Sequence, residues 1–137
     1  MANISCALLQ PSQRSPEVAR SRQLERTRRF DLHYAVRRTC GIDGFKPFLK
    51  GFVAARCQAD IIIQQDSGDA LYYLGPDYPF LLRKDPTEDD ILEMIDHACA
   101  NFDGPIWKEG LDIMREVESR SSGTHVGQEI ASMLRQL

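Results

Sequence analysis

The segment from Asp43 to Leu74 constrains the fold more than any other part of the sequence, because it carries the densest apolar pattern. Its first half has the i, i+3, i+4, i+7 and i+8 spacing of one helical face, at Phe45, Phe48, Leu49, Phe52 and Val53. Its second half contains consecutive isoleucines, Ile61 to Ile63, which are typical of a strand covered on both faces. The pattern predicts an amphipathic helix that packs against this strand.

Turn and breaker residues divide the rest of this region. The predicted strand covers residues 60–65, and the sequence DSGD at 66–69 follows it. Because Asp, Ser and Gly favour tight turns, we expect a hairpin with a second strand over residues 70–74. Residues 78–83 are a candidate for a further strand. Pro79 is compatible with the first residues of such a strand or with a strand at the edge of the sheet.

A different period marks residues 29–38. Apolar side chains fall at alternate positions there: Phe30, Leu32, Tyr34 and Val36. They would share one face of a strand but would scatter around the axis of a helix. The alternation predicts a strand over residues 29–38, and the competing interpretation is one long helix over residues 16–39.

The C-terminal third predicts helices. Thr87 and Asp90 have the spacing of a capping box before a helix over residues 88–102, and a Gly-Pro pair then starts a second helix. The sequence SRSSG at residues 119–123 predicts a flexible joint. After it, Thr124 is the expected cap of a last helix.

These elements predict an α+β fold in a single domain, residues 1–137, with a small, mainly antiparallel sheet of three to five strands. Helices pack on this sheet, and the C-terminal third is helical. A chain of 137 residues can bury a core of its own. No apolar run approaches the roughly 18 residues of a membrane span. No basic region precedes the short N-terminal apolar patch, so we expect no signal peptide.

Metal-binding and catalytic patterns are weak. Four cysteines, at positions 6, 40, 57 and 99, match neither a CxxC metal site nor a disulfide framework. Reduced thiols in a cytoplasmic protein are therefore expected. Glu93 and His97 could supply two metal ligands from one helix, but the sequence offers no third or fourth. We predict no catalytic residue, no metal and no cofactor.

The charge distribution is uneven. Residues 1–60 carry 11 Lys and Arg against 5 Asp and Glu, whereas residues 61–137 carry 6 against 15. The candidate residues for binding nucleic acid or an acidic partner are Arg20, Arg22, Arg26, Arg28, Arg29, Arg37 and Arg38. Arginine suits this role because its planar fork binds phosphate and carboxylate groups. The alternative is that these arginines are solvated or pair with the acidic second half.

Aromatic residues suggest a ligand pocket formed by Tyr72, Tyr78 and Trp107, since amphipathic rings are favoured in pockets and interfaces. The alternative is that they are ordinary core and edge residues.

Three functions remain open from the sequence. The leading hypothesis is a small cytoplasmic, non-enzymatic protein-interaction module that forms a homodimer, with its C-terminal helix packed across the partner chain. The second is a nucleic-acid-binding protein that uses the arginine-rich segment 14–38. The third is a small-molecule-binding protein or enzyme with an aromatic-lined pocket.

Overall fold

The computed structural model describes residues 22–23, 25–37 and 46–136. At its centre lies a three-stranded sheet with the strand order β1-β2-β3. Its strands are β1 (Leu32–Tyr34), β2 (Asp60–Gln64) and β3 (Leu81–Leu82). Both neighbouring pairs are parallel. The prediction of a mainly antiparallel sheet is therefore wrong.

The sheet is parallel because a helix lies in each connection between consecutive strands. Helix α2 (Leu49–Arg56) joins β1 to β2, and α3 (Ala70–Leu74) joins β2 to β3. Residues 70–74 are thus helical, and the predicted hairpin is wrong. In the turn before α3, Gly68 has φ +57°, and a Cβ there would lie 2.0 Å from the carbonyl oxygen of Lys46. This turn therefore requires glycine.

Strand β2 lies in the hydrophobic core. All five of its residues are buried, as the run of isoleucines predicts. The residues that α2 buries are small, Gly51, Ala54 and Ala55, and Phe48 is buried just before the helix. Leu49 is exposed, so its predicted place on the packed face is wrong, and Phe45 lies outside the described residues.

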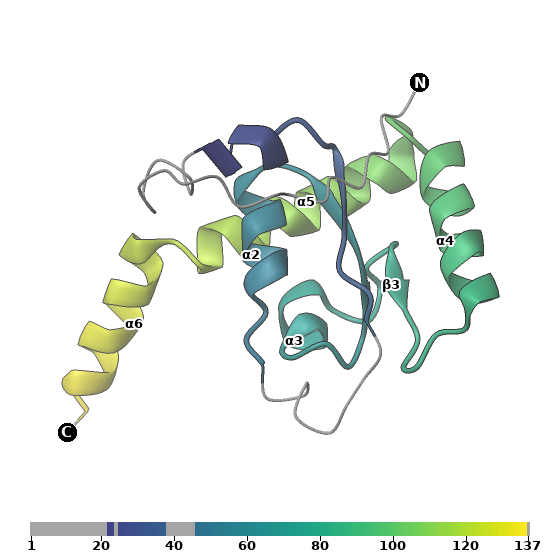
Figure 1. The fold of residues 1–137 in the computed structure, drawn as a ribbon. Coiled ribbons are helices and arrows are strands. Elements are labelled where there is room, and N and C mark those ends of the chain that lie inside the picture. The colour runs from purple at the N-terminus through teal and green to yellow at the C-terminus, as the bar shows by residue number, and fades with distance from the viewer. Residues whose placement is uncertain (1–21, 24, 38–45, 137) are drawn as a thin grey trace, which may run out of the picture.

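The C-terminal helices are α4 (Glu88–Ala100), α5 (Pro105–Arg120) and α6 (Gly123–Leu134), which confirms the three helices predicted there. Helix α5 packs against α2, α3 and β2, whereas α4 packs against β3. In Figure 1, α5 runs across the molecule behind α2, and α6 extends away from the sheet on the side opposite α4.

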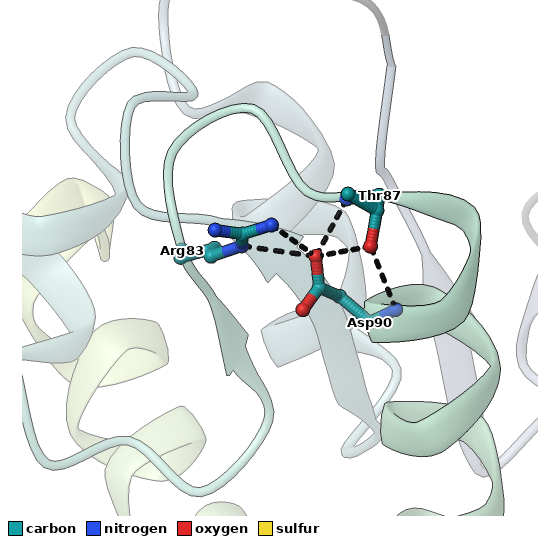
Figure 2. Close-up of polar contacts among 3 residues, drawn as sticks. All are labelled: Arg83, Thr87 and Asp90. Atoms are coloured by element: carbon teal, nitrogen blue, oxygen red, sulfur yellow. Dashed lines mark hydrogen bonds and ion pairs between the residues drawn. The ribbon is translucent and has the colours of Figure 1, made fainter.

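The start of α4 has the predicted capping box. The Thr87 hydroxyl accepts a hydrogen bond from the backbone N–H of Asp90, and Asp90 Oδ2 accepts one from the backbone N–H of Thr87. Arg83, just after β3, donates to the same Oδ2 (Figure 2). Hydrogen bonds from Thr87, and then the Arg83 guanidinium, lower the pKa of Asp90 to about 2. The cap thus ties the end of β3 to α4.

The N-terminal part confirms the core of one predicted strand. Residues 22–23 and 25–27 are helical, and residues 32–34 form β1. One continuous helix over residues 16–39 is therefore excluded, and the predicted strand over 29–38 is shorter than expected.

Candidate interaction surface

Helix α6 presents its apolar side chains to solvent. None of its residues is buried. Its largest apolar residues are between 41 % and 68 % exposed: Val126, Ile130, Met133 and Leu134. Their i, i+4, i+7 and i+8 spacing places them on one helical face. The apolar face of α6 is therefore exposed, whereas the apolar face of an amphipathic helix is normally packed against other residues.

The local sequence explains why the helix begins where it does. Helix α5 ends at Arg120, and Ser121 and Ser122 form the link to α6. The Ser122 hydroxyl accepts a hydrogen bond from the backbone N–H of His125 at 3.2 Å. The cap is therefore Ser122, and the prediction of Thr124 as the cap is wrong. The predicted joint at 119–123 overlaps this link only at Ser121 and Ser122, because its first two residues belong to α5 and Gly123 belongs to α6.

A second apolar surface lies on α3, close to the start of the link. Tyr72 is 71 % exposed and its neighbour Leu71 is also exposed. The guanidinium carbon of Arg120 lies 4.9 Å from the centre of the Tyr72 ring and 5.2 Å from that of Tyr73. These cation–π contacts join α3 to the last residue of α5. The apolar surface of α3 therefore lies close to the start of α6.

The predicted arginine site is only partly described. Four of its seven arginines are described and exposed: Arg22, Arg26, Arg28 and Arg29. None of these four forms an ion pair with an acidic residue in the ranges that the structure describes. Arg37 is half-buried, and its backbone N–H donates to Gln64 Oε1 at 2.9 Å. Arg20 and Arg38 lie outside the described residues.

The three aromatic residues of the predicted ligand pocket do not converge. Tyr78 and Trp107 are 3 % and 5 % exposed, and both pack on Phe80, whereas Tyr72 faces solvent on α3. Trp107 does line an open pocket of about 590 Å³, together with Phe102 and charged side chains of α5 such as Arg115. The pocket is open at the surface, and Tyr72 and Tyr78 do not line it.

A buried polar pair was missed at the sequence level. Asp60, the first residue of β2, has no exposed surface, and its Oδ1 accepts a hydrogen bond from the Tyr78 hydroxyl at 3.2 Å. The same hydroxyl accepts a hydrogen bond from the backbone N–H of Ile61 at 2.8 Å. Burial raises the pKa of Asp60 to about 7, and burial beside Asp60 raises that of Tyr78 well above its ordinary value. The one sequence signal was an acidic residue directly before an isoleucine run.

The remaining candidate groups are His33, Cys57, His97 and Cys99. Burial lowers the pKa of His33 on β1 and raises that of the half-buried Cys57. Cys99 and His97 are exposed on α4. Within the described ranges, no three His, Cys, Asp or Glu side chains are grouped so that they could hold a metal ion. None of the described helices is long and apolar enough to cross a membrane.

Comparisons with known proteins add no family to this description. No protein-family model matches the chain, and no curated protein and no solved structure is significantly similar to it.

Proposed function

We propose that the protein is a homodimeric interaction module whose α6 buries its apolar face against a second copy of the chain. The observation that carries this proposal is the exposed stripe of Val126, Ile130, Met133 and Leu134. A contiguous apolar surface on a soluble chain is a mark of an interface. Isolated helices shorter than about 12–15 residues are marginal in water. Helix α6 has 12 residues, so packing against another surface would stabilise it.

The stripe suits a second copy because it can pair with itself. Val126, Ile130 and Met133 are separated by four and then three residues, the spacing of a coiled-coil seam. In an antiparallel pair of identical helices, Ile130 of one copy would lie near Met133 of the other, and the reverse contact would form by symmetry. Such an isologous contact closes at two subunits. The exposed Leu71 and Tyr72, near the start of α6, would extend the apolar area of this interface.

Sedimentation velocity or light scattering on the full chain tests this proposal. We expect a dimer at micromolar concentration and a monomer for the double variant Ile130→Glu, Met133→Glu. The matched control is Gln128→Glu, which adds a charge on the opposite face of the same helix and should leave the dimer intact. A wild-type chain that stays strictly monomeric at high micromolar concentration would contradict the proposal.

A second candidate function is binding of nucleic acid through the arginine-rich segment. It is supported by the exposure of Arg22, Arg26, Arg28 and Arg29 without ion pairs to described acids. Exposed guanidinium groups that no described acid neutralises can bind phosphates.

Filter binding with DNA and RNA at several salt concentrations tests this second function. We expect affinity to fall steeply with salt, and Arg22→Glu combined with Arg26→Glu to weaken it further. Lys50→Glu combined with Arg56→Glu, an equivalent double charge reversal at exposed positions of α2, is the control. Binding that is the same in the double variant and the wild type would exclude this function.

A further inference from the structure

The Asp60 carboxyl group is enclosed where the sheet meets α5. Its side chain has no exposed surface. One oxygen, Oδ1, accepts the hydrogen bond from Tyr78. The other, Oδ2, is buried and has no hydrogen-bond partner among the described residues. A buried carboxylate oxygen without a donor strongly disfavours the ionised form.

Helix α5 lies directly on this carboxyl group. The contact is made at Gly110, where a Cβ would lie 2.5 Å from Asp60 Oδ1 and 3.1 Å from Phe80 Cε2. Gly110 is buried within α5, and Met114 on the next turn is also buried. The helix backbone is therefore held against the carboxyl group without an intervening side chain.

Few charged groups act on Asp60. Tyr78, in the segment between α3 and β3, donates its hydroxyl hydrogen to the carboxyl group. Arg115, on α5, acts on it through its positive charge. Arg115 is itself paired with Asp112 at the surface. From the segment before β1, Asp31 contributes its backbone carbonyl, which accepts from the Asp60 N–H at 3.0 Å. Arg115 is thus the single positive charge among these groups. Burial outweighs both the Tyr78 hydrogen bond and this charge, so the pKa of Asp60 rises from 3.8 to about 7.

We propose that Asp60 is a pH-sensitive latch for α5, which is seated on β2 while the carboxyl group is neutral and loosens when it ionises. The proton leaves Asp60 for solvent, and the carboxylate then carries a charge against the α5 backbone with one oxygen unpaired. Movement of α5 away from the sheet would let water hydrate that charge. Because α6 follows α5 after a two-residue link, its position would change with it. This latch does not depend on dimerisation.

Trp107 gives a direct readout of the latch. It is the one tryptophan of the sequence, it is nearly buried, and it lies on α5 one turn before Gly110. Between pH 5 and 9, we expect its fluorescence emission to shift to longer wavelength with a midpoint near pH 7. The variant Asp60→Asn keeps the shape of the side chain but cannot ionise, so its emission should stay constant over this range.

Two control variants separate Asp60 from other titrating groups. His97 lies beside Phe80, which Trp107 also contacts, so His97→Gln tests whether a histidine causes the change. Glu116→Gln removes an exposed acid of α5 and leaves the Asp112–Arg115 pair intact. Both variants should keep the transition. A transition that survives in Asp60→Asn, or one that disappears in His97→Gln, would overturn the proposal.

A second measurement on the wild-type chain covers the case in which Asp60→Asn fails to fold. Carboxyl carbon NMR should show Asp60 titrating near pH 7, and hydrogen exchange of the α5 amides should accelerate over the same pH range beyond the intrinsic base dependence. Titration of Asp60 near pH 4, or α5 protection that does not change across its titration, would contradict the latch.

Discussion

Gly110 lies so close to Asp60 that a Cβ built on the glycine would be 2.5 Å from the carboxyl oxygen Oδ1. This contact allows α5 to approach the first residue of β2, and it also encloses the carboxyl group. One glycine thus determines both the packing of the long helix and the chemistry of the buried acid.

The first prediction concerns this glycine. Gly110→Ala should lower the free energy of unfolding, because the added methyl group overpacks the contact at a cost of about 1–3 kcal/mol. This loss should exceed the gain of roughly 1 kcal/mol that alanine brings to a helix interior. Urea denaturation measures the change. The control is Gly127→Ala in α6, where a Cβ meets nothing within 4 Å, and no loss of stability is expected there.

The second prediction concerns the Tyr78 hydroxyl. Tyr78→Phe removes the acceptor of the buried Ile61 N–H and the donor to Asp60. A buried group left unsatisfied costs about 1–3 kcal/mol, so we expect a loss of that size in chemical denaturation. Tyr72→Phe, at an exposed tyrosine, should change stability by less than about 0.5 kcal/mol. Equal effects of the two variants would refute the role assigned to the buried hydroxyl.

The third prediction concerns pH and the stability of the whole chain. The pKa of Asp60 is 3.8 when unperturbed and about 7 in the fold, so the folded state holds this proton more tightly. The contribution of the Asp60 proton to the free energy of unfolding is therefore fully present below about pH 4 and is lost as the pH rises through 7. The shift corresponds to on the order of 4 kcal/mol. Between pH 5 and 8, Asp60→Asn should lose less stability than the wild type, and parallel pH profiles of the two proteins would contradict this.

The fourth prediction concerns the cap of α4 (Figure 2). Thr87→Ala should cost about 1 kcal/mol in thermal or urea unfolding, because it removes the acceptor of the Asp90 N–H. Thr124→Ala is the control, since this exposed threonine is not the cap of α6.

The lowered pKa of Asp90, about 2, adds a pH dependence of opposite sign to that of Asp60. Its stabilisation is present above about pH 4 and is lost as the pH falls towards 2.

The fifth prediction concerns the core. Phe80 is fully buried and contacts Tyr78 and Trp107. Phe80→Ala should therefore cost about 3–5 kcal/mol through lost burial and a cavity. Leu92→Ala, at an exposed position of α4, should have little effect. Similar losses in both variants would mean that Phe80 is not a core residue.

The sequence by itself determined the elements whose signals are local. The capping box at Thr87 and Asp90 fixed the start of α4, and the run Ile61 to Ile63 identified a strand buried on both faces. Such signals work because capping hydrogen bonds and side-chain period involve residues within one or two turns. Helix α6 was also predicted from its period, although period alone does not reveal whether an apolar face is covered.

Only the tertiary structure decided the direction of the strands and the buried acid. The pattern of residues 70–74 suits a strand or a short helix, and the helix is stabilised by contacts from elsewhere: the Tyr73 ring stacks on Phe48 at 5.6 Å between ring centres. That helix turns the chain so that β3 enters parallel to β2. Likewise, Asp60 and Tyr78 are 18 residues apart, and their contact arises only when the chain folds. Long-range packing selects between local alternatives of similar free energy, and a period of a few residues carries no information about it.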